Sequence, residues 1–60
     1  MVRIEVTYID TDPASDIFRG AIVVEVPASL DHDGQYGQAK QLAAGRIPAS
    51  ATITEYLWLK

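Results

Sequence analysis

The stretch VRIEVTYI, residues 2–9, decides the fold, because its side chains alternate strictly between two sets. One set is apolar or aromatic: Val2, Ile4, Val6 and Tyr8. The other set is mixed: Arg3, Glu5, Thr7 and Ile9. A period of two residues is that of a β-strand with one face buried and the other toward water. The stretch therefore predicts a half-buried strand that needs other strands beside it and a layer over its apolar face.

A second alternating segment follows a loop. The stretch DTDPAS, residues 10–15, contains the Asp, Pro and Ser residues that interrupt regular elements, so it predicts a hairpin loop. Beyond the loop, one alternation contains Phe18, Gly20, Ile22, Val24 and Val26, and the other contains Arg19, Ala21, Val23 and Glu25. Pro27 then lacks the N–H that would continue the ladder. We expect a second strand, antiparallel to the first.

The segment from Pro27 to Gly45 holds the one expected helix. Ser29, Asp31 and Asp33 could each serve as its N-cap, so the start is open between residues 29 and 33. At about 100° per residue, one arc of the helix gathers four side chains. They are Tyr36, Ala39, Leu42 and Ala43. This periodicity favours a helix from residue 33 to residue 44, with Gly45 as a left-handed residue after its end.

The last segment, ATITEYLWLK (residues 51–60), returns to residue types that favour strands. The element order is thus β-β-α-β, in a single small domain of 60 residues with an α+β fold. We expect a three-stranded antiparallel sheet in the order 2-1-3, with the helix packed on one face. The alternative order, 1-2-3, contains a parallel pair.

The last strand has apolar residues on both alternations, so its facing is ambiguous. Thr52 and Thr54 are typical of a wet surface, which assigns their alternation to the uncovered face of the sheet. Tyr56 and Trp58 then project onto that same face. The helix side receives Ile53, Leu57 and Leu59, with Glu55 as an exception.

This assignment predicts a partner-binding surface on the uncovered face. It would gather Tyr56, Trp58, Val23, Ile9, Arg19 and Thr54. Exposed apolar patches commonly bind something, and a chain of this size gains stability from association. We weigh three interpretations: the aromatic rings merely cover cross-strand neighbours, they contact a partner protein or a second copy, or they stack on nucleobases with help from Arg3, Arg19 and Lys60.

Composition limits these classes. The formal net charge is −3 and the isoelectric point is near 4.7, which disfavours the basic footprint that nucleic acids require. The chain has no cysteine, which rules out disulfides and thiolate zinc sites. Since no stretch approaches the roughly 20 apolar residues that cross a bilayer, we expect a cytoplasmic protein without a membrane span.

Catalytic and cofactor motifs are weak. The sole histidine, His32, lies between two aspartates without a second base or a nucleophile, and we interpret it as a solvated residue near the helix start. Asp10 and Asp12 begin like a calcium loop, but the later ligand positions do not follow. Gly34 and Gly37 match no phosphate-binding fingerprint. We expect no enzyme activity, metal or cofactor.

The leading hypothesis is a small acidic protein-interaction module, of the kind that phages and plasmids use as inhibitors or accessory proteins. That comparison rests on size and charge alone. A single-stranded nucleic-acid-binding sheet and a structural subunit of a homo-oligomer are the alternatives.

Overall fold

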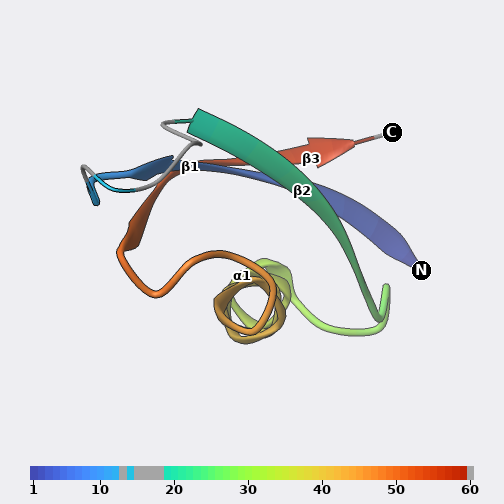
Figure 1. The fold of residues 1–60 in the computed structure, drawn as a ribbon. Coiled ribbons are helices and arrows are strands. Elements are labelled where there is room, and N and C mark those ends of the chain that lie inside the picture. The colour runs from blue at the N-terminus through green and yellow to red at the C-terminus, as the bar shows by residue number, and fades with distance from the viewer. Residues whose placement is uncertain (13, 15–18, 60) are drawn as a thin grey trace.

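The computed structural model describes residues 1–12, 14 and 19–59. These residues form β1 (Val2–Asp10), β2 (Arg19–Val26), α1 (His32–Ala44) and β3 (Ala51–Leu59). The strands make one antiparallel sheet in the order β2-β1-β3, and α1 lies against one face of it (Figure 1). The predicted α+β fold and strand order are confirmed. The predictions for Phe18 and Lys60, and part of the predicted loop, lie outside the described residues.

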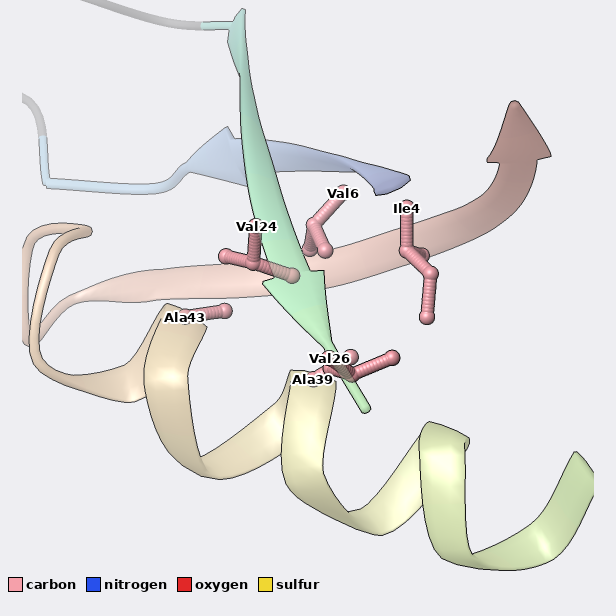
Figure 2. Close-up of a cluster of buried hydrophobic side chains, with 6 residues drawn as sticks. All are labelled: Ile4, Val6, Val24, Val26, Ala39 and Ala43. Atoms are coloured by element: carbon pink, nitrogen blue, oxygen red, sulfur yellow. The ribbon is translucent and has the colours of Figure 1, made fainter. Parts of the chain in front are cut away.

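The core lies between β1, β2 and α1, as the alternation of residues 2–9 predicted. Ile4, Val6 and Val26 are the largest fully buried side chains. The helix adds only Ala39 and Ala43, whose small side chains let it approach the sheet closely (Figure 2). A core built from so few large side chains leaves a small margin of stability.

Helix α1 begins one residue earlier than predicted. Asp31 is the N-cap, and its carboxylate accepts a hydrogen bond from the backbone N–H of Gly34 at 2.7 Å. Asp33 lies in the first turn, where its negative charge interacts favourably with the helix dipole. Within the described part of the chain, no helix is long and apolar enough to cross a membrane.

The prediction of a left-handed Gly45 is wrong. Gly45 has φ −84° and ψ −7°, in the right-handed region. The chain keeps turning in the same sense because the backbone N–H groups of Arg46 and Ile47 both donate to the carbonyl of Ala43. Those bonds satisfy the Ala43 carbonyl, one of the last four of the helix, without a change of hand.

A β-bulge interrupts β3 and reverses the predicted facing of most of that strand. Thr7 pairs with Glu55 and Tyr8 pairs with Ile53, so Thr54 is left without a partner on β1. One extra residue changes the parity of the alternation. Residues before the bulge therefore keep the predicted face, and residues after it exchange faces.

A buried carboxylate holds the start of β3 to the end of β1. Asp10 is buried, and it accepts hydrogen bonds from the backbone N–H of Asp12 and from the hydroxyl of Ser50. Thr11 adds a bond from its hydroxyl to the carbonyl of Ser50. The first aspartate of the calcium-like stretch thus has a structural use.

Candidate interaction surfaces

Trp58 lies on the helix side of the sheet, so the prediction that it projects from the uncovered face is wrong. Its ring stacks on the ring of His32, with centroids 4.3 Å apart and planes at 22°. Its indole N–H donates to the side-chain oxygen of Gln35 at 2.9 Å. The indole therefore fastens the end of β3 to the first turn of α1. His32, predicted to be solvated, is exposed but has this aromatic neighbour.

Tyr56 also faces the helix, and its predicted exposure on the other face is likewise wrong. Its ring is tilted at 56° against that of Tyr36, with centroids 4.6 Å apart. Burial raises the pKa of the Tyr56 phenol above its usual value, and the charge and hydrogen bonding of Tyr36 raise it further. The two rings thus form one contact between β3 and α1.

The uncovered face keeps an apolar patch of different composition. Across the sheet, Val23 on β2, Glu5 on β1 and Leu57 on β3 form one row. Leu57 is 50% exposed and Val23 is 40% exposed. Ile9, at 38%, lies two rows away and pairs with Arg19. We call Val23, Leu57 and Ile9 the open-face patch.

The predicted site residues thus divide into two groups. Val23, Ile9, Arg19 and Thr54 are exposed, as predicted. Thr54 sits at the bulge, where its hydroxyl donates to the carbonyl of Thr7 at 3.3 Å. Leu57 was predicted to face the helix and is exposed on the other face, although Glu55 carried the necessary signal: the predicted alternation placed a carboxylate beneath the helix.

A groove runs between α1 and β3. It encloses about 380 Å³ and is predominantly apolar. From α1 it is lined by Tyr36, Lys40 and Ala44, from β3 by Ala51, Ile53 and Tyr56, and from the connection by Ile47, Pro48 and Ala49. The three helix residues are spaced four apart and so share one face of α1. We call this feature the α1–β3 groove.

The groove exists because the helix and the bulged strand are offset. Ala39 and Ala43 of α1 pack on the core formed by β1 and β2, which places the helix toward that side of the sheet. The bulge meanwhile turns Ile53 and Tyr56 toward the helix side, where α1 covers them only in part. The result is an apolar channel along β3.

The two edges of the sheet differ. At the β2 edge, the guanidinium of Arg46 donates to the carbonyl of Val23 at 2.9 Å, and Pro27 follows the strand directly. Both features obstruct the pairing of another strand. Among the described residues, no side chain forms such a bond with the backbone of β3.

The described side chains include no group of three or more His, Asp or Glu residues placed to hold a metal ion. The two surface features that the described residues form are the open-face patch and the α1–β3 groove. Searches against family models, curated protein sequences and solved structures returned no match for this chain.

Proposed function

We propose that this chain is a small, cytoplasmic, non-enzymatic protein-interaction module whose uncovered sheet face docks on another protein. The observation that carries the proposal is the row of Val23, Glu5 and Leu57, which presents two half-exposed apolar side chains on a face that no helix covers (Figure 1). Large apolar side chains exposed on one uncovered face of a small domain support a contact site there.

The charges around the patch suit a protein partner. Arg3 pairs with Glu25 across β1 and β2, and Arg19 pairs with Ile9. A few apolar side chains among both signs of charge resemble the polar rim and apolar centre of transient interfaces. Such a surface selects a partner with an apolar centre and a mixed-charge border.

The face is small, which limits the strength of the contact. Strands of about eight residues at about 3.4 Å per residue, with neighbours about 4.8 Å apart, give a face of about 400 Å². A standard interface buries about 800 Å² on each partner. We therefore propose a transient contact, or one in which the partner also touches an edge of the sheet.

Nucleic-acid binding loses the feature that motivated it. The two aromatic rings that would have stacked on bases are instead paired with His32 and Tyr36. Base stacking requires an exposed ring face combined with a basic surface.

The test is site-specific photo-crosslinking in the native host. A photoreactive phenylalanine analogue replaces Leu57, and the matched control carries it at Leu42, an exposed leucine of α1. We expect a discrete covalent adduct from position 57 that is absent from position 42, and we expect Leu57→Gln, unlike Leu42→Gln, to prevent the same adduct from a Val23 probe. No adduct from position 57, or equal adducts from both positions, would refute the proposal. An adduct of twice the chain mass would show that the uncovered face contacts a second copy of this chain instead of another protein.

A further inference from the structure

We infer that the α1–β3 groove binds an extended peptide segment of another protein, which adds to the free edge of β3 as a fourth strand. An apolar side chain of that segment enters the groove against Ile53 and the Tyr36–Tyr56 ring pair, and a carboxylate of the segment lies beside Lys40. This inference concerns a different surface from the open-face patch and stands independently of the proposed function.

The first support is the direction of the backbone groups on β3. The Val23 carbonyl accepts from Arg46 and therefore points away from β1. Antiparallel partners alternate between hydrogen-bonded and non-hydrogen-bonded pairs. Val23 and Glu5 are therefore a non-hydrogen-bonded pair, so the N–H and C=O of Glu5 point toward Leu57 on the other side. The N–H and C=O of the next residue, Tyr56, then point outward from the sheet. An incoming strand could pair with these groups.

The second support is that the groove lies beside that edge. A volume of about 380 Å³ is at the low end of the range of ligand pockets, about 300 to 1,000 Å³. It has room for one or two side chains rather than a folded surface. A strand that adds to an edge sends alternate side chains to one face, and here that face holds Ile53, Tyr56 and Tyr36. Backbone pairing supplies affinity and the groove supplies selectivity.

The third support is charge. Of the described residues that line the groove, Lys40 is the one that carries a charge. Its ammonium extends from an exposed helix position and is matched by a single carboxylate. Because the whole chain has a net charge of −3, a strongly acidic segment would be repelled. The ligand is therefore an extended, mainly apolar segment with one carboxylate, either a chain terminus or an Asp or Glu side chain.

The contrast between the two edges argues for specific binding of a strand at β3 rather than non-specific association of both sheet edges. The β2 edge is obstructed by Arg46 and Pro27, whereas no described side chain bonds to the backbone of β3. Natural sheets protect edges that have no partner. A strand added at β3 would form backbone hydrogen bonds with the unprotected edge and also bury apolar side chains in the adjacent groove.

The test selects ligands from two random heptapeptide libraries, one with free C-terminal carboxylates and one with amidated ends. Both are selected on the intact wild-type chain. We expect enriched peptides with an apolar residue at a constant distance from a carboxylate. Enrichment from the free-acid library alone identifies a chain terminus, and enrichment of Asp or Glu from both libraries identifies a side chain.

Three variants then locate the site. Lys40→Gln should weaken the selected peptides at least tenfold, and Ala44→Phe, which fills the groove from an exposed position, should do the same. Ala28→Phe makes the same change at an exposed residue outside the groove and should alter affinity less than twofold. Far-UV circular dichroism checks that each variant is folded. Bound peptide should slow hydrogen exchange of the Tyr56 amide.

Several results would overturn the inference. One is the absence of any enriched peptide, and another is equal peptide affinity of all three variants. A third is protection of the Tyr56 amide that increases with protein concentration when no peptide is present, because a second copy of the chain would then occupy the β3 edge. Leu57→Gln should leave peptide affinity unchanged, and Ala44→Phe should leave the open-face crosslink unchanged. Each surface can therefore fail without the other.

Discussion

Replacing Trp58 and Leu57 separately by threonine tests which way β3 faces. The two residues are neighbours in sequence and point to opposite sides of the sheet. Trp58→Thr removes a stack worth about 1 kcal/mol and a hydrogen bond worth about 1 kcal/mol. It also loses about 1 kcal/mol from the half-buried part of the ring. The sum is about 3 kcal/mol.

This loss is large for the molecule. At about 0.05 to 0.15 kcal/mol per residue, a chain of 60 residues has a free energy of unfolding of about 3 to 9 kcal/mol. Leu57→Thr should change it by less than about 0.5 kcal/mol, because the site is half exposed and threonine is a good strand former. Trp58→Thr should therefore remove between a third and all of the stability.

Urea denaturation followed by far-UV circular dichroism measures both effects. With a slope of about 1 kcal/mol per molar urea, a loss of 3 kcal/mol moves the midpoint by about 3 M. Trp58→Phe is the graded control, since it keeps a ring that can stack and loses only the bond to Gln35. Equal losses for both threonine variants, or a greater loss for Leu57→Thr, would refute the assigned facing of β3.

Three further predictions concern the helix start, the tyrosine pair and the bulge. Asp31→Ala should lower the free energy of unfolding by about 1 kcal/mol through loss of the N-cap, and more than Asp33→Ala does, as thermal midpoints would show. Tyr36→Phe should lower the pKa of Tyr56 toward its usual value without reaching it, because burial remains; carbon NMR of labelled tyrosine measures this. Since the folded state favours neutral Tyr56, the contribution of Tyr56 to stability should be constant below about pH 10 and be lost above it, and the loss should be smaller in that variant. A deletion of Thr54 should keep the fold and both faces, because that residue has no partner in the register; loss of cooperative unfolding would contradict the bulge.

The alternation of residues 2–9 was enough to predict the sheet. It identified β1 as half buried, and the expectation of antiparallel neighbours with a right-handed helix crossing then favoured the observed order β2-β1-β3. The local rules for helix starts also worked in part: Asp31 was one of three candidate caps, and its bond to Gly34 decides among them. The alternation of β1 and the helix cap depend on residues close together in sequence, which is why pattern alone reached them.

The groove was beyond the reach of pattern. Tyr36 shares an arc with Ala39, so periodicity assigned both to the core, yet Ala39 is fully buried and Tyr36 is 42% exposed. The difference arises because α1 lies toward β2, and a helical repeat carries no information about where on a sheet the helix sits. The protected β2 edge likewise depends on a bond between Arg46 and Val23, which are 23 residues apart.

The facing of β3, in contrast, could have been derived. Assigning Ile53 and Glu55 to one face places a carboxylate beneath the helix, where burial of an unpaired charge costs several kcal/mol. A single extra residue at Thr54 removes that cost and brings Ile53, Tyr56 and Trp58 to the helix side together. The bulge thereby does two things with one residue. It completes the apolar layer beneath α1, and it leaves Leu57 on the uncovered face, so that each side of β3 has an apolar surface available for contact.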